Sequence, residues 1–180
     1  MKTITGIFLL FLLTAGANAQ TMDTTSFKAE MVTRTATITV NGDIRNVFPL
    51  FGAFEERKWT RGWNPTLIYP ATETIEEGTT FKTPGHLHGE QEYVWRVSKY
   101  EEKQFLIQYM VYARDRCWTI TVSCAVLSDH KTSTTITYSF VGLNAMGNET
   151  NRHSIGVMYK FNLTDWEEEI NNYLKSLGAD

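Results

Sequence analysis

Residues 91–143 read QEYVWRVSKY EEK QFLIQYMVY ARDR CWTITVSCAVL SDHK TSTTITYSFVGL, a series of four long apolar-rich runs joined by three short polar connections. Within the runs, apolar and polar residues alternate, which is the pattern of a strand with one buried face. The polar connections are short enough for antiparallel hairpins. The stretch therefore predicts four long antiparallel strands: Gln91 to Tyr100, Gln104 to Tyr112, Cys117 to Leu127 and Thr132 to Leu143.

Smaller elements are predicted on the N-terminal side of these strands. Arg34 to Asn41 alternates as a strand, and Asp43 can then cap a short helix that ends near Phe51. Pro49 limits the length of that helix. The remaining predicted elements are a second short helix at Phe54 to Trp59 and short strands at Thr66 to Pro70 and at Thr79 to Thr83.

The tail of the chain, from about Gly147 to Leu177, is predicted to be helical. It carries apolar residues at helical spacing: Ile155, Tyr159, Trp166, Ile170, Tyr173, Leu174 and Leu177. Thr164 and Glu167 have the spacing of a capping box. The pattern fits either one long helix with a kink or two helices. Of these we expect one long helix, broken or bent near Asn162 to Thr164.

This order of elements predicts an α+β fold. A seven-stranded antiparallel sheet has one face that needs cover, and the closing helix is the element able to provide it. We therefore expect a curved sheet around a long C-terminal helix, with two short helices between the first and second strands. Such an arrangement leaves a space between sheet and helix, which the short helices can gate at one end.

Residues 1–19 have the pattern of a cleaved signal peptide. A short basic start precedes an apolar run from Ile4 to Leu13, and Ala17 and Ala19 are small residues where a signal peptidase reads the chain. The run is shorter than the roughly 20 apolar residues of a membrane-spanning helix. We expect cleavage after Ala19, a periplasmic or secreted location and no integral membrane segment afterwards.

The mature chain has the length of one domain. Residues 20–32 are expected to form a flexible lead-in, and residues 33–178 a single domain. The net charge is −3 with no basic block, which argues against nucleic acid and anionic membranes as main partners. Cys117 and Cys124 would lie about 23 Å apart on one strand, too far for a disulfide. Both are expected to be free thiols.

Several local motifs resemble those of a known superfamily. They are Val47-Phe48-Pro49-Leu50-Phe51-Gly52, Glu55, Trp59, Gly62-Trp63 and Pro65, then Gly78 to Phe81, Val94 to Val97, Thr137 to Phe140, and Trp166, Ile170 and Tyr173-Leu174. The chain thereby resembles the SRPBCC superfamily of START domains, pollen-allergen-like proteins and bacterial polyketide cyclase/dehydrase and lipid-transport proteins. The resemblance implies a helix-grip fold for residues 33–178, with a ligand-binding cavity whose contents differ between members.

The aromatic residues have two interpretations. They either fill the space under the helix, or line a pocket for an apolar or flat ligand with tyrosine hydroxyls as orienting groups. On the pocket interpretation the cavity residues are Trp59, Trp63, Tyr69, Phe81, Tyr93, Trp95, Phe105, Tyr109, Tyr138, Tyr159 and Trp166. Trp59 and Trp63 could close the mouth of the pocket or fasten their loop to the edge of the sheet.

Few charged side chains are candidates for an acid, a base or a metal ligand in the cavity. Glu56, with Glu55 beside it, would have a raised pKa if buried near the indoles, but we expect a solvated acid on a helix surface. Arg116 is expected to be solvated at a hairpin tip. His86 and His88 form a weak candidate metal site. No third ligand stands out, although Glu90 and Glu92 are close enough in sequence to be candidates, so no metal is predicted.

The function favoured by these observations is the binding of a small hydrophobic or amphipathic molecule, such as a lipid, an isoprenoid or a polyketide-like compound. One alternative is a polyketide cyclase or dehydratase-type enzyme that uses the same cavity, which requires an inward-facing acid or base. A third is a protein-interaction module, which requires a large exposed apolar patch. No cofactor is predicted, and the sequence makes no prediction of oligomeric state.

Overall fold

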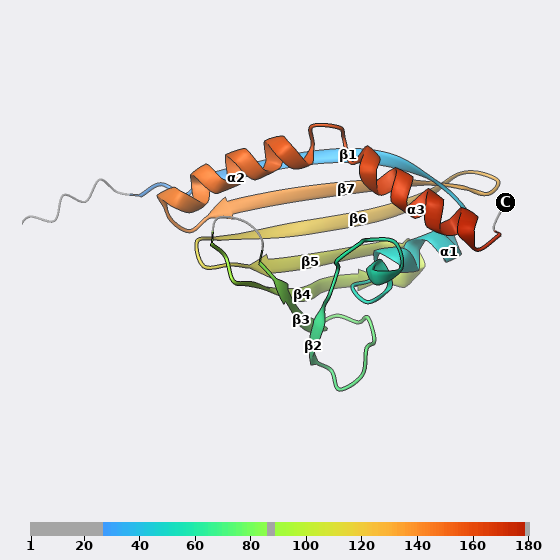
Figure 1. Cartoon of the computed structure of the whole chain (residues 1–180), viewed down its shortest axis with the longest axis horizontal. Helices are drawn as coiled ribbons and strands as arrows, with labels where there is room; N and C mark the ends of the chain where they lie inside the picture. Colours follow the sequence, from blue (N-terminus) through green and yellow to red (C-terminus); the bar gives the residue numbers. More distant parts are fainter. Residues whose placement is uncertain (1–26, 86–88, 179–180) are drawn as a thin grey trace, which may run out of the picture.

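A seven-stranded antiparallel sheet forms the body of the computed structural model, which describes residues 27–85 and 89–178. Its strand order is β1-β7-β6-β5-β4-β3-β2 (Figure 1). The strands are β1 (Met31–Asn41), β2 (Thr66–Tyr69), β3 (Thr80–Pro84), β4 (Glu92–Glu101), β5 (Leu106–Tyr112), β6 (Arg116–Ser128) and β7 (Lys131–Gly142). The predicted antiparallel sheet and its four long central strands are confirmed.

Short helical elements connect β1 to β2, as predicted. They are α1 (Ile44–Val47) and the 3₁₀ turns η1 (Phe48–Phe51) and η2 (Glu55–Lys58); a further 3₁₀ turn, η3 (Glu102–Gln104), joins β4 to β5. The carboxylate of Asp43 caps α1 by accepting the backbone N–H of Arg45 at 2.8 Å. These elements bring η2 over the inner face of the sheet, where its side chains meet those of the central strands.

The C-terminal tail forms two helices, which corrects the expected single long helix. These are α2 (Ala145–Met158) and α3 (Thr164–Ser176). Between them Asn162 and Leu163 have φ values of 52° and 60°, a left-handed conformation that interrupts a helix. The Leu163 side chain is only 2% exposed, so its burial helps to hold this turn. Both helices cover the sheet near β1 and β7 (Figure 1).

Helix α3 also covers the free edge of β1. The Glu167 carboxylate accepts the Thr39 N–H at 2.8 Å, and the Asn171 amide pairs with the backbone at Asn41 N and Thr39 O. The helix N-cap is Leu163, with no side-chain cap bond, so the predicted capping role of Glu167 is wrong. Glu167 instead satisfies part of an exposed strand edge.

The first strand begins earlier than predicted. β1 starts at Met31 rather than Arg34, because its backbone pairs with β7 along its whole length, from Met31–Val141 to Asn41–Lys131. The preceding residues are tied to α2: the Asn148 side chain donates to Lys28 O at 2.9 Å and accepts the Glu30 N–H at 3.0 Å. The described end of the predicted flexible lead-in is therefore anchored.

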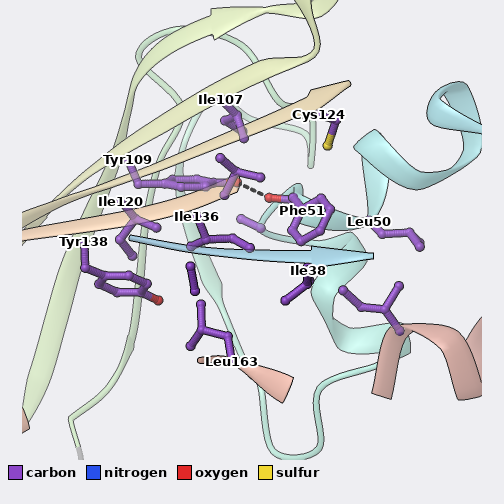
Figure 2. Packing of buried hydrophobic residues seen from close by; sticks show 14 of the residues in the cluster. Ile38, Leu50, Phe51, Ile107, Tyr109, Ile120, Cys124, Ile136, Tyr138 and Leu163 are labelled. Carbon is purple, nitrogen blue, oxygen red and sulfur yellow. Dashed lines mark hydrogen bonds between the residues drawn. The ribbon is translucent and has the colours of Figure 1, made fainter. Parts of the chain in front are cut away.

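The core lies on the inner face of the sheet, between the strands and the helices. Alternate residues of the central strands point into it, among them Ile107, Ile120 and Ile136 (Figure 2). The outer face carries hydroxyl pairs instead, such as Thr35 and Thr137, whose oxygens lie 2.9 Å apart. Cys124 is buried and Cys117 half-buried, and both are free thiols, as predicted.

Candidate ligand-binding cavity

A cavity of about 380 Å³ opens on the inner face of the sheet beneath η2 and the loop that follows it. Its lining combines seven aromatic side chains with a few aliphatic and polar ones: Glu56, Trp59, Thr60, Arg61, Gly62, Trp63, Phe81, Trp95, Tyr109, Ile120, Val122, Tyr138 and Trp166. Its volume falls within the range of about 300–1,000 Å³ that is usual for small-molecule sites.

The floor of the cavity follows from strand register. Ile120 of β6 is paired with Tyr109 of β5 on one side and with Tyr138 of β7 on the other. Directly opposed residues point to the same face of a sheet, so the two phenol rings flank an aliphatic floor completed by Val122. The Tyr109 hydroxyl donates a hydrogen bond of 2.8 Å to the carbonyl of Phe51 (Figure 2). This bond ties the floor to η1.

Indole rings form the upper wall of the cavity, and hydrogen bonds fix three of them. Trp59 donates its Nε1–H to Leu50 O at 2.8 Å, and Trp63 donates to Ala53 O at 2.5 Å. Trp95 donates to Thr83 Oγ1 at 2.9 Å. These N–H groups already have partners within the protein. The three indoles therefore offer a ligand their faces and edges rather than a hydrogen bond.

The rings contact one another at edge-to-face angles. Trp63 and Trp95 have centroids 5.3 Å apart at 87°, and Trp59 and Trp166 have centroids 5.5 Å apart at 61°. Trp166 also meets Tyr138 at 6.4 Å and 75°. Such contacts contribute about 0.5–1.5 kcal/mol per pair beyond burial, so this aromatic wall is rigid as well as apolar.

Glu56 places a carboxyl group among these rings. The residue is half-buried in the cavity lining, and burial raises the pKa of its carboxyl well above the ordinary value of 4.5. Burial first, and the charge of Glu56 second, raise the pKa of both Tyr109 and Tyr138 well above 10.0. The carboxyl therefore lies near both phenols.

The cavity leaves a few of its polar groups without a protein partner. Within the described part of the chain, the Glu56 carboxyl, the Tyr138 hydroxyl and the Trp166 indole N–H make no hydrogen bond, and the Thr60 hydroxyl is buried without one. Buried polar groups normally have partners, and leaving one unsatisfied costs about 1–3 kcal/mol. These groups are available to orient a bound molecule.

The buried acid predicts a pH-dependent effect on stability. Folded protein keeps the proton on Glu56 at pH values where the unfolded chain, with a pKa near 4.5, has lost it. Wild-type stability therefore falls as pH rises from about 4.5 toward the raised folded pKa, and a glutamine removes that loss. Urea unfolding should show Glu56→Gln more stable than wild type at about pH 8 and equal to it at about pH 4.

Glu55 supplies the matched control for this prediction. Its carboxylate pairs with Lys58 on the surface, and its side chain is 39% exposed. Glu55→Gln should gain no stability at about pH 8. An unchanged pH profile in Glu56→Gln would contradict the buried position of the Glu56 carboxyl.

A smaller cavity of about 160 Å³ lies beside the first and shares Trp63, Trp95 and Tyr138 with it. A buried ion pair closes its far side. The Arg116 guanidinium donates to both oxygens of Glu90, at 2.8 and 2.7 Å, and to Ser154 Oγ at 3.1 Å. The arginine and glutamate side chains are 2% and 5% exposed, so the expectation that Arg116 is solvated is wrong.

Most of the predicted cavity residues come together in the structure. Seven line the larger cavity: Trp59, Trp63, Phe81, Trp95, Tyr109, Tyr138 and Trp166. Tyr93 lines the smaller one, where its ring meets Trp118 at 5.2 Å. Both interpretations of the aromatic residues therefore apply, because the same rings fill the core and line a cavity.

Three predicted cavity residues lie elsewhere. Tyr69 is 58% exposed, because it belongs to the edge strand β2. Phe105 precedes β5 with a φ of 52° and packs on Phe48 at 5.7 Å, so the strand alternation does not extend to it. Tyr159 fills the space behind Tyr138, with its hydroxyl bonded to Ile136 O at 3.2 Å.

Two important side chains were not among the predicted site residues. Glu56 lies on a 3₁₀ turn of four residues, too short to show a periodic apolar face, and it was expected to be solvated. The sequence does contain a pattern that predicts burial of Arg116, because this residue continues the inward-facing alternation of Trp118, Ile120 and Val122 on β6. Extending that strand by one residue would have placed the arginine inside.

The weak metal candidates His86 and His88 lie outside the described residues. Glu90, a possible further ligand, is engaged by Arg116. Across residues 27–85 and 89–178, no group of three histidine, cysteine, aspartate or glutamate side chains could hold a metal ion. Burial raises the pKa of Cys124 to about 11, so its thiol is not a reactive nucleophile.

Comparison with solved structures decides the fold family. The Zhui aromatase/cyclase from Streptomyces sp. R1128 superposes with a TM-score of 0.61 at 12% identity, over 81% of this chain and 94% of that one. Norcoclaurine synthase from Thalictrum flavum gives 0.57 at 10% identity, over 93% and 98%. This chain has a helix-grip fold.

Ara h 8.0201 superposes on this chain with a TM-score of 0.60 at 11% identity, over 82% of this chain and 99% of that one. At such identities the likeness concerns the fold. No family model matches the sequence, and no curated protein matches it. No helix in the described ranges is long and apolar enough to span a bilayer.

Proposed function

We propose that this helix-grip protein binds one small, mainly apolar molecule in the aromatic cavity. The observation that carries the proposal is the cavity of about 380 Å³ lined by seven aromatic side chains in an otherwise well-packed core. The superfamily fold, which typically holds hydrophobic ligands in the same place, supports it. Each buried methylene contributes about 0.8 kcal/mol, so an apolar body alone can support micromolar binding.

Export belongs to the same proposal. The signal-peptide pattern of residues 1–19, which lie outside the described residues, supports export to the periplasm or the medium. A binding protein in such a compartment would meet lipids, isoprenoids or aromatic compounds. Mass spectrometry of the protein purified from its own compartment, native and then after organic extraction, should identify a co-purifying molecule of that class.

The enzyme alternative gains one observation from the structure. Glu56 is an inward-facing acid near Tyr109 and Tyr138, which is the kind of group that a cyclase or dehydratase requires. Ligand binding remains the proposed function because the cavity alone is sufficient for it. Catalysis would also need a substrate whose reacting atom meets that carboxyl.

A cavity-filling substitution tests the proposed binding. Val122 forms part of the cavity floor, and Val122→Phe should weaken uptake of the neutral fluorescent probe N-phenyl-1-naphthylamine at least tenfold, about 1.4 kcal/mol, by occupying its space. Titration of probe fluorescence measures the affinity. Native near-ultraviolet circular dichroism would show that the variant has folded.

Thr119→Phe is the matched control, because Thr119 lies on the same strand but alternates to the opposite face from Val122. It adds comparable bulk outside the core and should leave probe affinity unchanged. Equal uptake by wild type and Val122→Phe would place the probe elsewhere. A wild-type protein that takes up no probe and carries no extractable molecule would overturn the proposal.

A further inference from the structure

The charge distribution of the aromatic cavity restricts the kind of ligand that suits it. Glu56 is the one acidic side chain in its lining, and Arg61 the one basic side chain. Arg61 is exposed at the mouth and makes no ion pair within the described residues. Tyr109 and Tyr138 stay neutral at physiological pH because their pKa values are raised. The group deep in the cavity that can take up a charge to match a ligand is therefore an acid, Glu56.

The cavity that this carboxyl lines is walled mainly by aromatic rings. It lies near the phenols of the floor, and Trp59 and Trp166 line the same cavity at edge-to-face contact distance from each other. The face of an aromatic ring is the negative part of its quadrupole and attracts cations within about 6 Å. Aromatic faces gathered around one carboxylate form the kind of environment that stabilises an ammonium group.

We propose that the cavity recognises an organic cation, an amine or quaternary ammonium group carried on an apolar body, with the cationic head beside Glu56 and the indole faces. This inference rests on the proposed function, since it names the class of ligand for the same site. Thr60, whose buried hydroxyl has no partner in the described chain, lines the same cavity and is a further polar group for such a ligand.

Other ligand classes suit the site less well. A purely apolar ligand would seal the Glu56 carboxyl away from water with no hydrogen-bond partner, which costs free energy. An anionic ligand would bring a like charge to the only acid of the cavity. A cation avoids both costs, and its contact with desolvated rings adds a favourable interaction.

The proposal predicts proton release on binding. Burial favours the neutral acid in the empty cavity, whereas a cation beside it favours the carboxylate, so binding and deprotonation are linked. Glu56 on η2 is faced by Tyr109 from β5 and Tyr138 from β7, while Asp165 on α3 acts on Tyr138. Since both phenols stay protonated, Glu56 is the group whose titration should govern affinity for a permanent cation.

Two probes of equal shape test the proposal. Benzyltrimethylammonium carries a permanent charge, and neopentylbenzene is its neutral isostere with carbon in place of nitrogen. Each is measured by competition against N-phenyl-1-naphthylamine on the full chain. At about pH 8 the cation should bind wild type at least tenfold more tightly than the isostere, and its affinity should rise from about pH 5 to about pH 8.

The Glu56→Gln variant supplies the decisive comparison, because the glutamine keeps the shape of the side chain. It should lose the preference for benzyltrimethylammonium and its pH dependence, while its affinity for neopentylbenzene stays the same or rises. A wild-type protein that binds the neutral isostere as tightly as the cation would overturn the cation proposal and leave the cavity intact. If neither probe displaces the naphthylamine, and the naphthylamine itself does not bind, the proposed function fails as well.

Discussion

Replacing Arg116 with methionine is expected to lower the free energy of unfolding by about 3–5 kcal/mol. The substitution leaves the Glu90 carboxylate without the guanidinium that holds both its oxygens, at 2.8 and 2.7 Å, in a place where the two side chains are 2% and 5% exposed. Methionine keeps much of the apolar stem. The loss should therefore come from the uncompensated charge rather than from a cavity, and urea unfolding at neutral pH measures it.

Lys82→Met is the matched control for this prediction. Lys82 pairs with Glu92 across β3 and β4 at 3.1 Å, with side chains 44% and 53% exposed, and breaking such a pair costs at most about 1 kcal/mol. The double variant Arg116→Met/Glu90→Gln should recover part of the loss, because no buried charge remains. A loss in Arg116→Met no larger than that in Lys82→Met would contradict the account of a buried pair.

This ion pair matters to the site because it joins elements that are distant in the chain. Arg116 begins β6, Glu90 lies in the connection between β3 and β4, and Ser154 belongs to α2. The guanidinium also lies 4.9 Å from the ring of Trp118, which lines the smaller cavity. The pair thus joins α2 to β6 beside the smaller cavity.

The sheet and the floor of the cavity could be predicted because both depend on a simple alternation. In β5, β6 and β7 every second residue faces inward, so Tyr109, Ile120 and Tyr138 follow from the pattern once the hairpins are recognised. Short polar connections leave little freedom in register. The family resemblance adds the helix-grip arrangement, which the structural comparisons confirm.

The position of Glu56 and the break before α3 could not be predicted, because both depend on tertiary contacts and not on a periodic sequence pattern. Glu56 faces the cavity because η1 and η2 fold over the sheet, with Trp59 and Tyr109 bonded to η1 carbonyls. The break before α3 occurs at Leu163, a residue type with no preference for a left-handed turn, and its burial outweighs the local preference. Tertiary packing decides both features, so a sequence pattern could not.

The start of α2 gives the second prediction of large effect: Gly147→Ala should destabilise the protein by about 3 kcal/mol. A Cβ at Gly147 would lie 1.9 Å from the carbonyl oxygen of Asp115, an atom that already accepts the Leu143 N–H at 2.8 Å. The helix would have to move away from the turn that connects β5 to β6. That movement would also weaken the cap in which Asn144 accepts the Gly147 N–H at 2.9 Å.

Gly156→Ala on the same helix separates this clash from the general effect of removing a glycine. A Cβ at Gly156 meets nothing within 4 Å, so alanine there should stabilise the protein by about 0.5–1 kcal/mol through a better helix propensity. Urea unfolding of the two variants should therefore give changes of opposite sign. Two stabilising changes would mean that α2 does not begin against the carbonyl of Asp115, and the packing of that helix over the cavity would need revision.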